Sequence, residues 1–251
     1  MEFNDRCIVL RVGTFREADL WVRLLSASRG VFSAFAFGGS KSRRRFSGCL
    51  DLFNEVVFHV KSDKQGEYLT LQEGVLIKGP SRLRRDWRRM GMAVNCAHFL
   101  ESFQISPDGA AEAHILFSSL LNAMEENEKI PSLLPIFFRA RLASGQGYAL
   151  EPGFCAACGK KRETGAEAVL PVNSSGLMCR SCAATGFSGG QRFILSPYSL
   201  ELLEHIFLLP LDEWDLDKFS SEAQNQCARA IDGFLQFSTG IYWDRGRFRK
   251  N

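Results

Sequence analysis

The sequence of 251 residues lacks several features that would place it in a familiar class of protein. No apolar run reaches the roughly 18 residues that a membrane-spanning helix requires. No segment has the spacing G-x-x-x-x-G-K-S/T of a phosphate-binding loop, so ATP hydrolysis by this chain is not expected. There is also no secretory leader with an apolar core, and we therefore expect a cytoplasmic protein.

What is present is an ordinary globular composition, with 45% hydrophobic and 24% charged residues and a length that suits one large or two ordinary domains. The net charge of +3 conceals an uneven distribution. Residues 1–89 hold 17 Lys and Arg against 10 Asp and Glu, whereas residues 90–251 hold 14 against 18. A basic part followed by a mildly acidic part is typical of a nucleic-acid-binding module joined to a docking module, although charge alone does not distinguish nucleic acid from other anions.

Four of the eight cysteines form two C-x-x-C pairs, Cys155 with Cys158 and Cys179 with Cys182. Each pair makes a tight turn that directs two thiolates at one ion, and two pairs complete the tetrahedral shell that Zn²⁺ prefers. The segments on either side of residues 173–175 are apolar, so a short hairpin there would bring the second pair to the first. The spacing predicts one Zn²⁺ per chain.

The predicted zinc is structural, because four thiolates leave no open position for water and the H-x-E of zinc deaminases is missing. Two disulfides or a redox C-x-x-C are the alternatives. The other four cysteines are isolated within apolar or helical patterns, where free cysteine behaves as a small core residue. They are Cys7, Cys49, Cys96 and Cys227.

Residues 1–79 have the alternating apolar pattern of β-strands. Five strands are predicted, over residues 7–12, 20–25, 31–37, 50–60 and 68–77. Five antiparallel strands in fewer than 80 residues predict a small barrel, for which the OB-fold is the first choice. Because many strands are apolar on both faces, we expect another layer to cover part of the barrel.

The connection between the third and fourth strands is strongly basic. It holds Lys41, Arg43, Arg44 and Arg45, followed by the aromatic Phe46. Cations beside an aromatic residue on a barrel predict contacts with the phosphates and bases of a nucleic acid. A solvated surface loop is the alternative.

The pattern becomes helical at Pro80, and a helix is expected to start at Ser81. Its first two turns carry Arg82, Arg84, Arg85, Arg88 and Arg89, where the helix dipole favours negative charge instead. Two explanations stay open: an exposed helix start with neutralising contacts from the barrel, or a second contact with nucleic acid.

Further helices are predicted from about residues 111, 131, 197 and 221. The expected organisation is therefore α+β, with an OB-fold domain over residues 1–79 and a helical domain over residues 80–251. The zinc module is inserted into the helical domain at about residues 151–190. Arg245, Arg247, Arg249 and Lys250 are expected to form a mobile basic tail.

This order of parts resembles the bacterial RecO family of recombination mediators. The resemblance extends over essentially the whole chain and rests on the order of several short segments. These are Arg16–Asp19, Gly30–Ser33, Gly38–Gly39 with the Ser42–Arg45 run, Leu50–Phe53, and the paired C-x-x-C motifs within helices.

The resemblance implies a non-enzymatic protein, found in the cytoplasm at the nucleoid, that binds single- and double-stranded DNA and anneals complementary strands. It further implies RecR as a partner in loading RecA onto DNA coated by single-stranded DNA-binding protein. On this view the helical domain would receive the tail of single-stranded DNA-binding protein, with Phe137, Phe138, Arg139 and Arg141 as candidate contacts. An RNA-binding or processing factor and a zinc-dependent enzyme are the alternatives.

Overall fold

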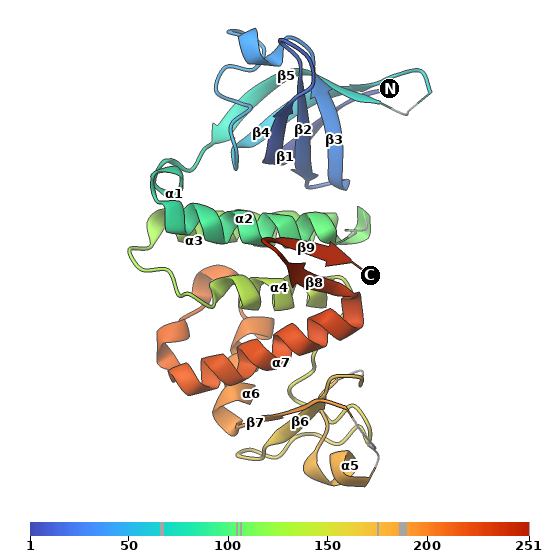
Figure 1. The fold of residues 1–251 in the computed structure, drawn as a ribbon, viewed down its shortest axis with the longest axis vertical. Coiled ribbons are helices and arrows are strands. Elements are labelled where there is room, and N and C mark those ends of the chain that lie inside the picture. The colour runs from blue at the N-terminus through green and yellow to red at the C-terminus, as the bar shows by residue number, and fades with distance from the viewer. Residues whose placement is uncertain (66–67, 104, 106, 175, 186–189, 251) are drawn as a thin grey trace. The chain divides into compact units, whose positions relative to one another are not determined.

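The computed structural model describes residues 1–65, 68–103, 105, 107–174, 176–185 and 190–250 (Figure 1). Contacts divide the chain into two compact units. The first comprises Met1–Ala93 with Gln104–Asn127, and the second comprises Val94–Phe103 with Glu128–Asn251. The division into domains at residues 79 and 80 stays a prediction, since this partition by contacts also assigns helical segments to the first unit.

The first unit contains the five-stranded barrel. Its strands are β1 (Glu2–Thr14), β2 (Leu20–Ser26), β3 (Gly30–Ala36), β4 (Glu55–Ser62) and β5 (Leu69–Lys78), and they close in the order β1-β2-β3-β5-β4 (Figure 1). Neighbouring strands are antiparallel, except that β3 meets β5 in parallel through the pair Phe35 and Thr70. This is the Greek-key order of an OB-fold, which confirms the predicted fold.

The fourth strand starts later than predicted. Residue 50 was expected to open it, whereas β4 begins at Glu55. The chain between β3 and β4 forms a 3-10 turn, η1 (Gly39–Lys41), and further turns. The last of these turns ends at Phe53, whose φ is +64°. A residue in this left-handed conformation cannot extend a strand, and it therefore sets the boundary.

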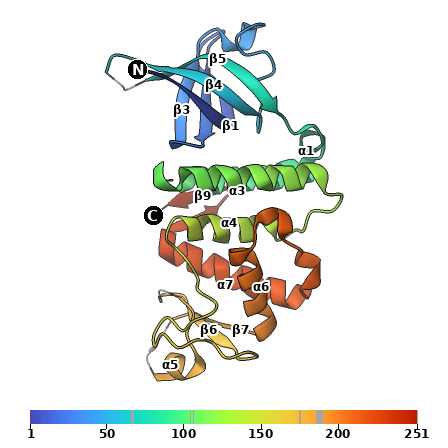
Figure 2. The ribbon, with the colours of Figure 1, turned by 180° about the vertical axis from the view of Figure 1, so that it is seen from behind.

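One face of each strand fills the barrel. The buried interior includes Val9, Val22, Leu24, Ala34, Ala36, Val56, Phe58, Val60 and Leu71. Ile8, Leu10 and Leu25 are also buried, although they are not part of this interior cluster. Helix α3 (Pro107–Glu126) contacts β1, β2 and β3 and supplies the expected covering layer (Figure 2).

The first helices differ from the prediction in their boundaries. The helix expected from Ser81 is divided into α1 (Ser81–Arg85) and α2 (Trp87–Ser102), because Asp86 has the extended ψ of 109°. Helix α3 begins at Pro107, before the predicted start at about residue 111. Proline suits the first turn of a helix, where its missing N–H has no partner to lose.

The second unit has a helical core. Helices α4 (Leu134–Gly145), α6 (Pro197–Leu208) and α7 (Ser221–Thr239) pack on one another. The Ser196 hydroxyl accepts a hydrogen bond from the Ser199 N–H and caps α6, which starts where a helix was predicted from about residue 197. Two 3-10 turns, η2 (Leu211–Glu213) and η3 (Leu216–Lys218), connect α6 to α7.

Two small sheets complete the second unit. Strand β6 (Ala168–Pro171) pairs with β7 (Arg192–Leu195), and the short helix α5 (Arg180–Thr185) lies between them in the chain. Strands β8 (Ile241–Asp244) and β9 (Arg247–Lys250) form a hairpin at the C-terminus. No helix in the described ranges is long and apolar enough to cross a membrane.

The C-terminal hairpin corrects the prediction of a mobile basic tail. Phe248 is buried, and its ring meets that of Phe99 at a centroid distance of 5.2 Å. A single buried aromatic side chain among four cations therefore anchors a segment whose composition looked like that of a free tail.

Candidate metal centre and nucleic-acid interface

The sulfur atoms of Cys155, Cys158, Cys179 and Cys182 all lie within 4.8 Å of one another. A tetrahedral ion bound by thiolates at about 2.3 Å sets its sulfur ligands about 3.8 Å apart, so the cluster has the size of such a site. All eight cysteines are free thiols, which disagrees with the disulfide alternative. The four clustered residues can therefore hold a metal ion.

The backbone brings the two C-x-x-C turns together. The Ala156 N–H donates to the Leu177 carbonyl at 2.7 Å, which ties the first turn to the segment before Cys179. Val169 and Met178 form an antiparallel bridge, so the predicted hairpin exists as one bridge, with Ser175 outside the described residues. The longer pairing of β6 with β7 was not predicted.

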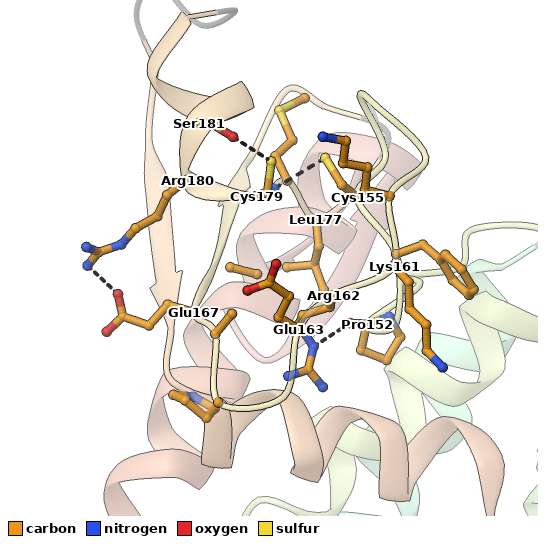
Figure 3. Close-up of a pocket in the computed structure, with 17 residues that line it drawn as sticks. Pro152, Cys155, Lys161, Arg162, Glu163, Glu167, Leu177, Cys179, Arg180 and Ser181 are labelled. Atoms are coloured by element: carbon orange, nitrogen blue, oxygen red, sulfur yellow. Dashed lines mark hydrogen bonds and ion pairs between the residues drawn. The ribbon is translucent and has the colours of Figure 1, made fainter.

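Backbone and hydroxyl donors favour thiolates in the cluster (Figure 3). Burial alone would raise the pKa of Cys155, but N–H groups, first that of Cys179 at 3.3 Å from the sulfur, lower it. The Ser181 hydroxyl and the Cys182 N–H lower the pKa of Cys179 to about 6. The neighbouring sulfur of Cys179 raises the pKa of Cys182 to about 12, and a cation among the four would offset this repulsion.

A groove of about 790 Å³ lies beside the cluster (Figure 3). Arg162 in its wall donates to the Pro152 carbonyl at 3.0 Å and pairs with Glu204 at 2.6 Å. Arg180 pairs with Glu167. These cations are thus held by the protein itself, and the lining residues include no histidine that could serve as a base beside a nucleophile.

The basic loop of the barrel contains two kinds of cation. Lys41 pairs with Glu17 at 3.2 Å, and the Arg45 guanidinium donates to the Phe37 carbonyl at 2.6 Å. Arg43 and Arg44 are exposed, and their side chains form no ion pair or hydrogen bond with the part of the chain that the structure describes. These two arginines are the most available to an anionic ligand.

Phe46 does not have the exposure that a base-stacking residue needs. Its side chain is 3% exposed and belongs to the interior cluster of the barrel. The interpretation of Phe46 as a stacking platform is corrected on this ground. The residue instead anchors the basic loop, and the Arg45 guanidinium lies 5.1 Å from the centroid of its ring.

An aromatic cluster on the barrel was missed in the sequence. Phe35 lies at its centre, with ring centroids at 4.9 Å from Phe15, 6.2 Å from Phe37 and 6.4 Å from Tyr68. The three outer rings are 47%, 46% and 56% exposed, in that order. Ser33, Phe35 and Phe37 alternate on one face of the predicted strand, and the polar Ser33 indicates that this face is exposed. This was the signal in the sequence for exposed aromatic residues.

The position of the cluster matches the binding surface of the OB-fold. That surface comprises strands two and three and the loops that follow strands one and four. Phe35 is on β3, Phe15 directly follows β1, and Tyr68 directly precedes β5 in the connection from β4. Arg16 adds a cation, at 5.2 Å from the centroid of the Phe15 ring.

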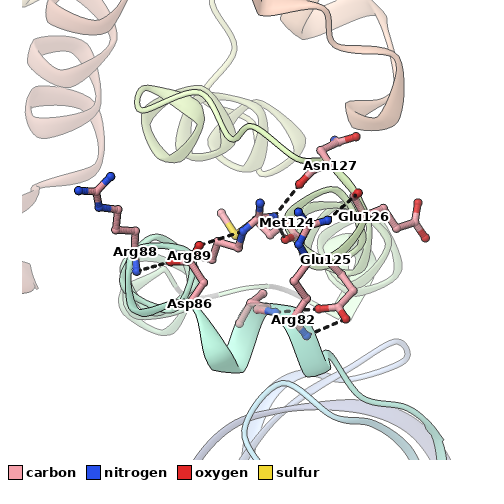
Figure 4. Close-up of polar contacts among 9 residues, drawn as sticks. Arg82, Asp86, Arg88, Arg89, Met124, Glu125, Glu126 and Asn127 are labelled. Atoms are coloured by element: carbon pink, nitrogen blue, oxygen red, sulfur yellow. Dashed lines mark hydrogen bonds and ion pairs between the residues drawn. The ribbon is translucent and has the colours of Figure 1, made fainter.

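Two of the helical arginines are structural. Arg84 donates to the Leu52 carbonyl at 3.0 and 2.6 Å. Arg89 is buried, donates to the carbonyls of Met124 and Asn127, the latter at 2.7 Å, and pairs with Asp86 at 3.2 Å (Figure 4). Neither side chain is available to a nucleic acid. Arg82, Arg85 and Arg88 stay exposed.

The negative charge missing from the start of α1 comes from Glu125 of α3. Its carboxylate accepts hydrogen bonds from the N–H groups of Ser81 at 3.1 Å, Arg82 at 2.9 Å and Leu83 at 2.8 Å (Figure 4). Burial raises the pKa of Glu125, but these donors outweigh burial and lower it. The neutralising contact that was expected from the barrel is therefore supplied by α3 instead, and it satisfies the N–H groups of the helix start.

The candidate docking residues lie mainly in the core of the second unit. Phe137 and Phe138 are fully buried, so neither can contact a partner while α4 is packed. Arg139 pairs with Asp232 at 3.5 Å and faces the ring of Phe248 at 5.1 Å. Arg141 is partly buried. The expectation that Phe137 and Phe138 contact the tail of a partner is therefore corrected.

The whole chain resembles known proteins. A family model described as "Recombination protein O N terminal" matches residues 1–80, and one described as "Recombination protein O C terminal" matches residues 84–247. The DNA repair protein RecO of Oleidesulfovibrio alaskensis is 45% identical over 251 residues, the whole of both chains. That of Lawsonia intracellularis is 38% identical over 258 aligned residues, again the whole of both chains. That of Geobacter metallireducens is 30% identical over 74% of this chain and 75% of its own.

We expect Glu125→Ala to lower the free energy of unfolding by about 1–2 kcal/mol at pH 7, because three N–H groups lose their acceptor. The folded-state pKa of Glu125 is lowered, so its stabilisation is fully present above the unfolded-state pKa and is lost as the pH falls below about 4. Urea unfolding at pH 7 and pH 3.5 measures both effects. Glu126→Ala is the control, and equal losses in the two variants would contradict the capping role.

Proposed function

The chain belongs to the RecO family of DNA repair and recombination proteins, and we propose that it acts as a mediator that binds single- and double-stranded DNA and anneals complementary strands. We further propose that, with RecR, it helps RecA to load onto DNA coated by single-stranded DNA-binding protein. Members of this family are not enzymes, in agreement with the expectation from the sequence. The cytoplasmic nucleoid is the proposed site of action.

The observation that carries the proposal is the junction of the basic loop with the aromatic cluster. The Gly38 N–H donates to the Asp19 carboxylate at 2.7 Å, and the Ser40 N–H donates to the Ala18 carbonyl at 3.2 Å. These bonds fasten the basic loop to the loop that carries Phe15 and Arg16. Cations for phosphates and rings for bases therefore occupy one region of the barrel, which is the arrangement of a single-strand-binding surface.

Such a surface explains annealing without a catalytic group. Exposed cations hold a polyanionic strand and screen its repulsion from a second strand, while exposed rings stack on bases of any type. Base pairing between the strands then supplies the specificity. Binding would be sensitive to salt and tolerant of sequence. Arg82, Arg85 and Arg88 are proposed to extend the phosphate contacts, with Arg88 5.2 Å from the centroid of the Trp87 ring.

The proposed partners are RecR and the C-terminal tail of single-stranded DNA-binding protein. We assign neither to a surface, because Phe137 and Phe138 are buried. The proposed metal is one structural Zn²⁺ per chain. Cys155, Cys158, Cys179 and Cys182 would hold it, and it would cross-link the two C-x-x-C turns in a module that has little core of its own.

We expect purified, reduced protein to contain one zinc per chain by elemental analysis. A chelator should lower the melting temperature, because the metal contributes on the order of 10 kcal/mol to the folding of its module. The variant Cys155→Ser with Cys158→Ser is the control and should not respond to the chelator. Purified, reduced protein without stoichiometric zinc, or a chelator that leaves the melting temperature of the wild-type protein unchanged, would contradict a structural zinc.

We expect replacement of Lys41, Arg43 and Arg44 by Ala to flatten the salt dependence of binding to an oligo(dT). With about 0.7 counterions released per phosphate contact, the log-log slope should fall by up to about 2. Fluorescence anisotropy at several salt concentrations measures the slope. The control replaces three exposed cations of the second unit, Lys129, Lys218 and Arg229. An unchanged slope would remove the basic loop from the interface.

We expect Phe37→Ala with Tyr68→Ala to weaken binding to single-stranded DNA by at least roughly 30-fold, because each of the two lost stacking contacts contributes about 1–3 kcal/mol. Binding to a duplex of equal length should change much less, since its bases are not free to stack. Tyr198→Ala, at an exposed aromatic residue of the second unit, is the control. An equal loss for duplex and single strand would contradict stacking, and tighter binding to a matched RNA would favour an RNA-binding factor.

A further inference from the structure

The C-terminal hairpin is a firmly held platform. Phe248 and Ile241 are buried, and the ring of Phe248 lies against Phe99, at a centroid distance of 5.2 Å, and under the Arg139 guanidinium, at 5.1 Å. The Thr239 hydroxyl accepts from the Ile241 N–H at 3.1 Å, which fixes the start of β8 to the end of α7. Its position is thus set by packing within the second unit.

The hairpin carries an excess of cations. Residues 241–250 include four Arg and Lys and one Asp. Asp244 pairs with Arg249 at 2.7 Å and lies 3.9 Å from Arg245. Arg247 and Lys250 are exposed and form no ion pair with the described residues. One carboxylate cannot neutralise this set, so the hairpin presents positive charge to solvent.

The turn of the hairpin has an unfavourable residue type at its first position. Arg245 and Gly246 form the two-residue loop, with φ values of +46° and +84°. A turn with two positive φ values favours Asn, Asp or Gly at its first position, and arginine there is strained. The side chain of Arg245 is 90% exposed and therefore gains little from packing. The hairpin places a cation at its tip where a better turn residue would fit.

An aromatic ring accompanies these cations. Trp243 lies opposite Phe248 in the register, with ring centroids 4.7 Å apart in an edge-on arrangement. Its side chain is 50% exposed. The buried half is held by Phe248, and the exposed half offers a flat surface that does not need to be ordered on binding. The hairpin thus combines the two elements of a single-strand-binding surface, an aromatic platform and phosphate-binding cations.

We propose that this hairpin is a second binding site for single-stranded DNA, with Trp243 stacking on a base and Arg245, Arg247 and Lys250 contacting phosphates. It deepens the proposed function and rests on it, since annealing requires two strands on one protein and the barrel accounts for one. A tryptophan platform favours an unpaired strand over an acidic peptide or a lipid headgroup, whose chemistry would need only the cations.

The test uses the full chain with Arg245→Gly, Arg247→Gln and Lys250→Gln. Glycine suits the turn, and Phe248, Ile241 and the Arg249–Asp244 pair are kept, so the hairpin should stay folded. Two non-complementary oligo(dT) strands, one with a donor and one with an acceptor fluorophore, report energy transfer when both bind one protein. We expect the variant to lose this signal, to keep its affinity for one strand within about twofold, and to anneal complementary strands about tenfold more slowly.

Photocrosslinking gives an independent readout. An oligomer containing 5-bromodeoxyuridine should crosslink to Trp243 in the wild-type protein, as mapped by mass spectrometry of the peptides. Trp243→Leu should lose this crosslink and retain those to the barrel. The control variant with Lys129, Lys218 and Arg229 replaced has the same change in charge and should behave as wild type in both measurements.

The outcomes separate this inference from the proposed function. Wild-type energy transfer and annealing in the hairpin variant, or crosslinks confined to residues 1–78, would overturn the second site while leaving the barrel interface intact. Loss of all binding when Lys41, Arg43 and Arg44 are replaced by Ala would support the proposed function and would count against binding by the hairpin. Equal binding, energy transfer and annealing by the wild type and by both variants would overturn both, and a hairpin that binds an acidic peptide in place of oligo(dT) would identify a protein partner.

Discussion

The first unit depends on satisfying the unpaired N–H groups at the start of α1. A helix that opens with arginines has neither a capping side chain nor a favourable charge of its own. Glu125, 44 residues further along the chain than Ser81, supplies both. Because this carboxylate is on α3, and α3 covers β1, β2 and β3, the same contact fixes the helices to the barrel. Arg84 and Arg89 reinforce it by donating to carbonyls that the turns leave free.

The cations of this protein divide into two classes that the sequence does not distinguish. Arg84 and Arg85 are adjacent, yet the first is bonded to the Leu52 carbonyl and the second is exposed. Likewise, Arg45 is held by the Phe37 carbonyl while Arg43 and Arg44 are exposed. The cations available to a ligand are those that form no bond within the fold. The acceptors that bind the other cations belong to different segments of the chain.

Local signals in the sequence were sufficient for much of the fold. Alternating apolar residues indicated five strands, the helical pattern from about residue 197 indicated α6, and two C-x-x-C pairs indicated the sulfur cluster, because each signal lies within a few residues. The rest depended on distant partners. Phe46 stands next to arginines but packs inside the barrel, and Phe248 stands among cations but packs on Phe99. The aromatic cluster joins residues from three separate segments, and no window of sequence contains it.

Among the described residues the barrel closes through a single residue pair between β3 and β5, whereas every other neighbouring pair of strands has a long register. Phe35, which forms this pair, also lies at the centre of the aromatic cluster. The seam of the barrel and its proposed binding face are therefore the same place. A DNA strand bound across Phe37 and Tyr68 would stabilise the pairing of β3 with β5. DNA affinity and the closure of the barrel are therefore linked by mass action. Occupancy would register as slower amide hydrogen exchange along β3 and β5.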